Sequence, residues 1–288
     1  MVAIDAMNQL LVVSPSSRAL QNFTSVISSG DREVWFSYGE FIPALEDGFL
    51  FWGAGKFALS LKQLFPERSF SSPGAEWLGL VPPELSGRSV ICESFLDAVA
   101  HVDEPVWFKF AELKHDGVKP RSYRPEELLA LLVAMPELAE VKSQWTTSHL
   151  RLNFEHRFFV VEGEVLTGSP YHVDAVVGFE PGAAWRMFSE AEEFARFAAR
   201  ELVDQSPRAY TLDVALNEAT GKWFIVEANR AWSSGLYGCD PGRALVAVQA
   251  SLTPDAWSWL PDSVVGSYVS PLTVVQEPEF VPGILRVS

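Results

Sequence analysis

Short apolar runs separated by polar turns predict a chain in which strands and helices alternate. Residues 105–110 are bulky and β-prone on both faces, which predicts a short strand followed by a polar loop. Residues 125–135 have proline at the first helical position and end before the next proline, which predicts a helix. Ser189 and Glu192 have the spacing of a capping box, and the apolar spacing after them predicts a helix over 189–203. This order of elements is typical of a mixed α/β fold.

Turn residues and changes of period divide the chain into three parts. Residues 1–88 contain short apolar runs and end in a stretch rich in proline and glycine, which predicts a small N-terminal α/β domain. Residues 89–145 and 146–288 are expected to form two further α+β units. Within the last unit, a tight Glu162-Gly163 turn predicts a β-hairpin over 157–168.

A second hairpin is predicted further along the chain. If its loop has three residues and ends at Gly221 with a positive φ, Glu218 faces Lys222. The same register places Asp213 directly opposite Glu227. Two acidic side chains are therefore expected to meet on neighbouring strands.

Three oxygen donors are expected to converge on this hairpin. Asn229 lies two residues after Glu227, so it shares a face with Glu227 and with the opposing Asp213. Two carboxylates about 5 Å apart repel each other unless a cation neutralises them. Mg²⁺ prefers carboxylate and amide oxygens and shares its other positions with phosphates. We predict a Mg²⁺ site here; the alternative is an amphipathic hairpin with a hydrated polar face.

Composition narrows the class of protein. The chain has 288 residues, of which 48% are hydrophobic, so it can bury a substantial core. Asp and Glu number 37 against 22 Lys and Arg, and this acidity disfavours a nucleic-acid partner. Two cysteines are too few for a disulfide framework, and no apolar run approaches a signal peptide or a membrane span. A cytoplasmic protein without a membrane partner is expected.

The residues around the predicted metal site resemble a known family. Asp213, the Glu227-Ala-Asn229 triplet and the following Arg230 to Gly235 look like the closing metal motif and substrate loop of ATP-grasp ligases, which include D-alanine:D-alanine ligase, glutathione synthetase and biotin carboxylase. Lys109 resembles the early-strand lysine that contacts nucleotide phosphates in that family. The run 155–165 resembles a compact clade named for two active-site arginines and a lysine. The resemblance implies two α+β subdomains that grip ATP, preceded by the N-terminal domain.

The same resemblance implies further nucleotide contacts. Glu155 resembles the acidic residue that binds ribose, and Arg157 would face the phosphates, although a cross-strand salt bridge is its other interpretation. The phosphate-covering loop has one glycine, Gly117, where better-known members have several, so Lys114 is proposed to assist it. Lys109 by itself is also compatible with an edge-strand lysine that extends to solvent. Residues 141–145 resemble the hinge strand that binds adenine, which adds Lys142, Gln144 and Trp145.

The reaction implied by the resemblance is amide or peptide bond formation. A substrate carboxylate attacks the γ-phosphate of ATP, and an amine captures the resulting acyl phosphate, so the partners are small-molecule or peptide carboxylates and amines. Lys109 and Arg157 offset the charge of the transferring group. Arg230 is expected to bind the carboxylate, and a structural loop is its alternative. Two other functions stay open: a kinase that phosphorylates a small molecule at the same site, and a non-catalytic metal- and protein-binding module.

Overall fold

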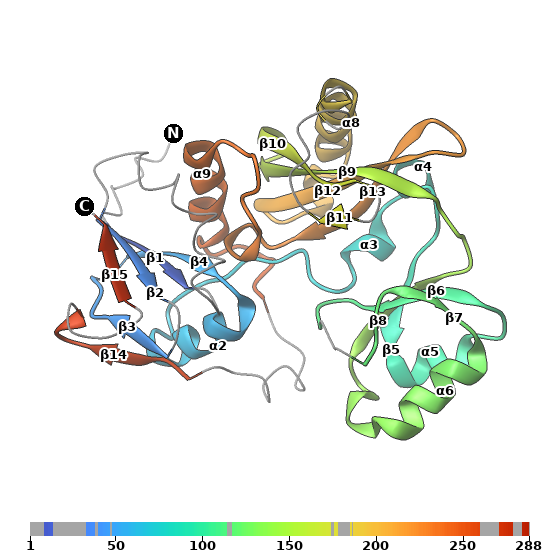
Figure 1. Cartoon of the computed structure of the whole chain (residues 1–288), viewed down its shortest axis with the longest axis horizontal. Helices are drawn as coiled ribbons and strands as arrows, with labels where there is room; N and C mark the ends of the chain where they lie inside the picture. The colour runs from blue at the N-terminus through green and yellow to red at the C-terminus, as the bar shows by residue number, and fades with distance from the viewer. Residues whose placement is uncertain are drawn as a thin grey trace.

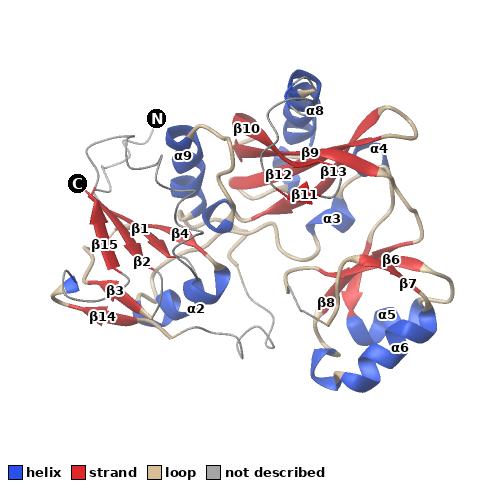
Figure 2. Ribbon diagram, viewed as in Figure 1, coloured by secondary structure: helices blue, strands red, loops and turns tan. Residues whose placement is uncertain are grey.

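The structure is a computed structural model of the chain. It describes residues 9–13, 33–37, 40–46, 48–113, 117–173, 176–177, 185, 187–259, 271–278 and 284–287. Figure 1 shows a sheet near the two termini, a larger sheet beside it and a smaller sheet at the far end of the molecule. Helices and strands alternate along the chain (Figure 2), so the predicted mixed α+β fold is confirmed. Within the described residues, no helix is long and apolar enough to cross a membrane.

The first sheet is built from both ends of the chain. Its order is β15-β2-β1-β4, with β1 parallel to β2 and β4, and β15 antiparallel to β2. Strands β1 and β4 are almost fully buried, as is typical of parallel strands covered on both faces. Strand β14 pairs in parallel with β3, so a segment from the C-terminal part of the chain lies beside the N-terminal part. This pairing was not predicted from the sequence. The bounds are β1 Gln9–Val13, β2 Glu33–Ser37, β3 Phe41–Pro43, β4 Leu50–Gly53, α2 Gly55–Leu64, β14 Thr273–Val275 and β15 Ile284–Val287.

The second four-stranded sheet has its own core. Its order is β5-β8-β6-β7, all antiparallel, and helices α5 and α6 lie against it (Figure 1). Phe108 is fully buried and packs against Phe95 and Tyr123. The predicted strand over 105–110 and helix over 125–135 are confirmed as β6 and α6. The bounds are β5 Ile91–Ser94, α5 Phe95–His101, β6 Val106–Phe110, β7 Arg121–Tyr123, α6 Pro125–Ala134, a 3-10 helix Pro136–Leu138 and β8 Lys142–Thr146.

The largest sheet carries a helix on each face. Its order is β11-β10-β9-β12-β13, and α8 and α9 contact β9, β10 and β12 from opposite sides (Figure 1). Phe158 belongs to the core under α8, whereas its neighbour Phe159 belongs to the core shared with α9 and the first sheet. The bounds are α3 Trp77–Leu80, α4 Pro83–Ser86, β9 Leu152–Val161, β10 Glu164–Val173, β11 Val176–Val177, α8 Phe188–Glu201, β12 Ala209–Asn217, β13 Lys222–Asn229 and α9 Pro241–Ser251. Two more 3-10 helices cover Val203–Gln205 and Ala231–Ser233.

The first predicted hairpin and the helix after it are confirmed. Strands β9 and β10 are longer than expected and meet at Glu162 and Gly163, both with positive φ. The predicted capping box is wrong, because α8 begins at Phe188 and Ser189 lies inside its first turn. The N-cap is Met187, and its side chain makes no capping hydrogen bond.

The turn of the second hairpin differs from the prediction by one residue. Gly221 has the predicted positive φ, at 67°. However, Asn217 pairs with Lys222, so Glu218 lies in the turn and does not face Lys222. Asn217 holds this turn with its own backbone, because its carbonyl accepts hydrogen bonds from the amides of Thr220 and Gly221.

A β-bulge restores the predicted pairing of the two carboxylates. Val214 pairs with Ile225, and the next pair along the ladder is Asp213 with Glu227. Val226 is therefore the extra residue on β13. Asp213 lies opposite Glu227, as predicted, although a different register at the turn leads to it.

Candidate functional site

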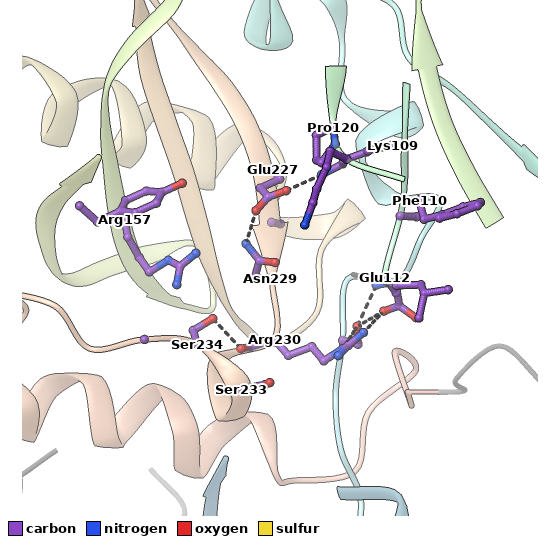
Figure 3. A pocket seen from close by; sticks show the side chains of 18 of the residues that line it. Lys109, Phe110, Glu112, Pro120, Arg157, Glu227, Asn229, Arg230, Ser233 and Ser234 are labelled. Carbon is purple, nitrogen blue, oxygen red and sulfur yellow. Dashed lines mark hydrogen bonds and ion pairs between the residues drawn. The ribbon is translucent and has the colours of Figure 1, made fainter. Parts of the chain in front are cut away.

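A cavity of about 610 Å³ lies where the second four-stranded sheet, β5-β8-β6-β7, and the five-stranded sheet face each other (Figure 3). Its size is within the usual range for small-molecule sites. Lys109 reaches it from the end of β6, and Glu227 and Asn229 reach it from the end of β13. The loop after β6, strands β9 and β10, and the segment after β13 supply further charged and aromatic groups, among them Glu112, Lys119, Arg157, Tyr171, Arg230 and Tyr237.

Arg157 and Asp213 form a buried ion pair on neighbouring strands. Arg157 donates from Nε to Asp213 Oδ1 at 2.8 Å and from Nη2 to Oδ2 at 2.7 Å. Burial disfavours the guanidinium cation, but the facing carboxylate outweighs this effect and raises the pKa of Arg157 above its ordinary value. The cross-strand salt bridge is therefore one role of Arg157. Asp213 is fully buried and does not belong to the described cavity lining, whereas its partner Arg157 does.

Glu227 connects the two sheets across the cavity. Its Oε2 forms an ion pair with Lys109 Nζ, and its Oε1 accepts from Asn229 Nδ2 at 3.0 Å (Figure 3). The same Nδ2 donates to Asp213 Oδ2 at 3.0 Å. Burial alone would raise the pKa of Glu227, but Lys109 and Asn229 lower it to about 2. Glu227 is thus held as a carboxylate.

The donor set is compatible with Mg²⁺. Within the described ranges, no group of three or more His, Cys, Asp or Glu side chains is placed to hold a metal ion. The candidate ligands are therefore the carboxylates of Asp213 and Glu227 and the amide of Asn229. Asn229 lies within hydrogen-bond distance of both carboxylates, and rotating its amide by half a turn presents Oδ1 in place of Nδ2. Glu227 and Asn229 line the cavity directly. Asp213 offers only the lone pairs that Arg157 leaves free.

Two tyrosines support the guanidinium of Arg157. The rings of Tyr171 and Tyr237 stack with centroids 5.1 Å apart, and the Arg157 guanidinium carbon lies 5.0 Å and 5.4 Å from them. Tyr237 has a φ of 49°, a conformation that costs energy for a residue with a side chain. The Tyr171 hydroxyl donates to Glu155, the predicted ribose ligand, and burial raises the pKa of Tyr171 well above its usual value. The sequence analysis did not identify these tyrosines as site residues.

Arg230 lies at the other end of the cavity and joins three parts of the chain. It donates from Nη2 to Oε1 of Glu112, which lies in the loop after β6, at 2.6 Å (Figure 3). Its Nε lies 3.4 Å from Ser72 Oγ, and its guanidinium carbon lies 4.7 Å from the centre of the Trp259 ring. Arg230, which is predicted to bind the substrate carboxylate, therefore already binds the carboxylate of Glu112.

The predicted adenine strand lies away from the cavity. Strand β8 is paired on one side with β5 and on the other with β6, so its backbone groups are engaged in both ladders. Its three candidate side chains bond elsewhere: Lys142 Nζ to Glu76 at 3.2 Å, Gln144 Nε2 to the Ala75 carbonyl at 2.7 Å, and Trp145 Nε1 to Glu93 at 2.8 Å. None of the three belongs to the described cavity lining. Lys114 lies outside the described residues.

Comparison with known proteins gives one family match. The sequence model of an ATP-grasp domain, family 2 of the clade named for two arginines and a lysine, matches residues 86–247. No curated protein matches the sequence. Among solved structures, a D-alanine–D-alanine ligase from Bacillus anthracis complexed with ATP is 14% identical, with a TM-score of 0.46 over 86% of this chain and 98% of that chain. A D-alanine–D-alanine ligase from Coxiella burnetii is 10% identical, with a TM-score of 0.49 over 85% and 94%. The ATP-grasp ligase PsnB, complexed with precursor peptide PsnA2 and AMPPNP, is 13% identical, with a TM-score of 0.42 over 86% and 98%.

Proposed function

Because this chain belongs to family 2 of the two-arginine, one-lysine clade of ATP-grasp domains, as its motifs indicated, we propose that it is a Mg²⁺- and ATP-dependent ligase. It would join a substrate carboxylate to an amine through an acyl phosphate. The matched range 86–247 contains the candidate side chains of both strand ends, from Lys109 to Arg230.

The charge of the cavity carries this proposal. The chain as a whole has a formal net charge of -15. The described cavity lining nevertheless has an excess of basic groups: Lys109, Lys119, Arg157 and Arg230 against Glu112 and Glu227. Concentrated basic groups in an acidic protein favour a site for an anion, and a triphosphate matches the size of the cavity.

We assign the phosphates to the end of the cavity where Lys109 and Arg157 lie. Lys109 extends from β6 toward β13, so it would exchange Glu227 for a phosphate oxygen. Arg157 is fixed by Asp213 and by two tyrosine rings, which keeps its position defined before the nucleotide arrives. Glu155, held by Tyr171, is proposed to contact ribose. We place the adenine contact in 147–151, the segment that leaves β8 for β9, because β8 itself is paired on both sides.

Glu227 and Asn229, with Asp213 behind them, are the residues proposed to hold Mg²⁺. When bound, the ion would neutralise charge that develops on the transferring group. Glu227 is held ionised by its surroundings, so no proton needs to leave it before the metal binds. The bulge at Val226 keeps Glu227 on the same side of the sheet as Asp213.

The proposed reaction needs no protein nucleophile. A carboxylate oxygen of the substrate attacks the γ-phosphorus, the bond to the β-phosphate oxygen breaks, and ADP leaves. The amine nitrogen then attacks the acyl carbon, phosphate leaves, and the amine proton passes to solvent. Arg230 would bind the substrate carboxylate in place of Glu112, because a bidentate guanidinium suits that group.

Two measurements test the function. The melting temperature should rise when ATP and Mg²⁺ are added together, by more than with ATP and a chelator, because a ligand that binds the folded state stabilises it. Incubation with ATP, Mg²⁺ and a panel of carboxylic acids and amines should release ADP and phosphate and form an amide detectable by mass spectrometry. A stable phosphoester in place of an amide would identify a kinase. The absence of any nucleotide-dependent stabilisation would identify a non-catalytic module.

A further inference from the structure

The β-bulge on β13 decides where Glu227 points. Ile225 faces the core under α8, where it pairs with Val214. In a regular strand, residues two apart share a face, so Glu227 would point into the same apolar core. The extra residue, Val226, turns Glu227 to the side of Asp213 and the cavity. The proposed metal site therefore depends on a local irregularity of the backbone.

A buried arginine outside the cavity lining binds this bulge. Arg88 is 7% exposed and donates from Nη2 to the carbonyl of Val226 at 3.1 Å. Its Nη1 lies 3.3 Å from the carbonyl of Ser86. Strand β13 lies at the edge of its sheet among the described strands, so its outer backbone groups have no neighbouring strand to bond. Arg88 supplies a donor at the residue where the ladder is interrupted.

The segment that carries Arg88 is fixed against β13. Gly87 has a φ of 70°, and a Cβ at this position would lie 2.8 Å from the ring of Phe224. Ser86 Oγ donates to the carbonyl of Arg88 at 2.6 Å. This close approach to Phe224 lies two residues before the bulge. Residues 86–88 therefore contact β13 through a glycine that permits close packing and an arginine that binds the bulged carbonyl.

We propose that Arg88 is a positioning residue that maintains the Val226 bulge and thereby directs Glu227 toward Mg²⁺. This inference rests on the proposed function for its metal, but the register of β13 is a property of the free protein. Arg88 has no place in the sequence analysis, because a lone arginine after a glycine carries no recognisable motif. It acts on the direction of Glu227 through the carbonyl of Val226, and its charge also interacts with the carboxylates of Glu227 and Glu155.

The test replaces Arg88 with methionine, which keeps the apolar stem and removes the donors. The matched control is Arg196→Met, since Arg196 Nη1 also donates to a strand carbonyl of this sheet, that of Val165, at 3.1 Å and away from the cavity. Two readouts are needed. Cross-strand NMR contacts of residue 213 report the register without any ligand. Isothermal titration with ATP, in Mg²⁺ and in a chelator, reports the metal-dependent part of binding.

We expect the 213-to-227 contact to be weakened or replaced by a 213-to-226 contact in Arg88→Met, and retained in Arg196→Met. Loss of a charged hydrogen bond corresponds to an affinity change of roughly tenfold, so ATP binding in Mg²⁺ should weaken by about that factor. Binding in the chelator should stay within about twofold of the wild type, a difference of less than half a kcal/mol.

Three results would overturn the inference. The first is an unchanged register in Arg88→Met. The second is an equal loss of ATP binding with and without Mg²⁺, which would indicate direct contact of Arg88 with the nucleotide. The third is the same change of register and the same loss of ATP binding in Arg196→Met. If the wild type itself shows no Mg²⁺-dependent ATP binding, the proposed function fails, and the register contact alone decides the role of Arg88. If Arg88→Met does not fold, Gly87→Ala replaces it, because it keeps the cation and displaces the segment from Phe224. It must then show the same change of register.

Discussion

Replacing Glu227 with glutamine removes one charge from the cavity and keeps the size of the side chain. Glutamine resembles the protonated form of glutamate, so the effect on stability can be obtained from the pKa of Glu227 in the folded protein. The ion pair with Lys109 is lost, whereas the hydrogen bond from Asn229 to the side-chain oxygen is retained. The fold should survive, because the apolar core of the sheet is untouched.

The expected loss of stability is moderate. The pKa of Glu227 is lowered from the ordinary 4.5 to about 2, because Lys109 and Asn229 outweigh the effect of burial. At about 1.36 kcal/mol for each pKa unit, this corresponds to at most about 3.4 kcal/mol. The Glu227 side chain is 31% exposed, so solvent screens part of this interaction. We expect a decrease of about 2 kcal/mol in the free energy of unfolding, or about 4 to 8 °C in melting temperature for a chain of this size.

The pH dependence of the free energy of unfolding follows from the direction of the pKa shift of Glu227. Folding lowers the pKa of Glu227, so its stabilising contribution is fully present above pH 4.5 and is lost as the pH falls from 4.5 toward about 2. The difference in stability between the wild type and Glu227→Gln should therefore be constant near neutral pH. It should become smaller below pH 4.5, since the wild-type carboxylate then gains the proton that glutamine mimics.

Thermal unfolding followed by circular dichroism, from neutral pH to about pH 3, measures both quantities. The control is Glu164→Gln on β10 of the same sheet, which breaks an exposed ion pair with Arg200 of α8 and should change the melting temperature little. With ATP present, addition of Mg²⁺ should raise the melting temperature of the wild type and of the control, but not of Glu227→Gln. Equal stability of wild type and variant at neutral pH, or a difference that does not shrink in acid, would refute the reasoning.

Three further substitutions test other parts of the site. Asp213→Asn should lower the free energy of unfolding by about 3 to 5 kcal/mol in urea denaturation, because the buried guanidinium of Arg157 loses its only carboxylate partner within hydrogen-bond distance among the described contacts. Lys109→Met should weaken ATP binding by about tenfold or more in isothermal titration, and an unchanged affinity would remove Lys109 from the phosphate site. Glu112→Gln should lower the KM for the carboxylate substrate, because Glu112 no longer competes for Arg230. A KM that rises would instead show that Glu112 helps to bind the substrate.

Local patterns were sufficient to predict the strands and helices around the site, but not elements such as β3, α9 or β14. Proline at the first position of α6, the Glu162-Gly163 turn and the positive φ of Gly221 are each determined by neighbouring residues. The register of the second hairpin shows the limit of such reasoning. The turn is one residue longer than predicted, and the bulge at Val226 compensates for it. The turn alone therefore does not set the pairing of Asp213 with Glu227, and the residue that donates to the bulge, Arg88, is distant in sequence.

The contacts that close the cavity could not be predicted from sequence spacing. Lys109 and Glu227 are 118 residues apart, and so are Glu112 and Arg230. Each pair joins the end of β6, or the loop after it, to the end of β13 or the residue after it, and no local pattern specifies how the two sheets approach each other. The pairing of β8 could not be predicted from local sequence either. Only its pairing with β5 on one side and with β6 on the other shows that its backbone groups are engaged.

These two cross-cavity ion pairs bear on how an acidic chain would accept the proposed nucleotide. Two cations of the cavity already bind anions of the chain, Lys109 with Glu227 and Arg230 with Glu112. On the proposed function, a phosphate would replace Glu227 at Lys109 and the released Glu227 carboxylate would be available to Mg²⁺, whereas Glu112, released by Arg230, would keep its contact with Ser72 Oγ. The desolvation cost of the protein groups is met on folding, before the ligand arrives. The same exchange would break the ion pairs between the β5-β8-β6-β7 sheet and the five-stranded sheet when the ligand enters, and the ligand would then connect the two sheets in their place.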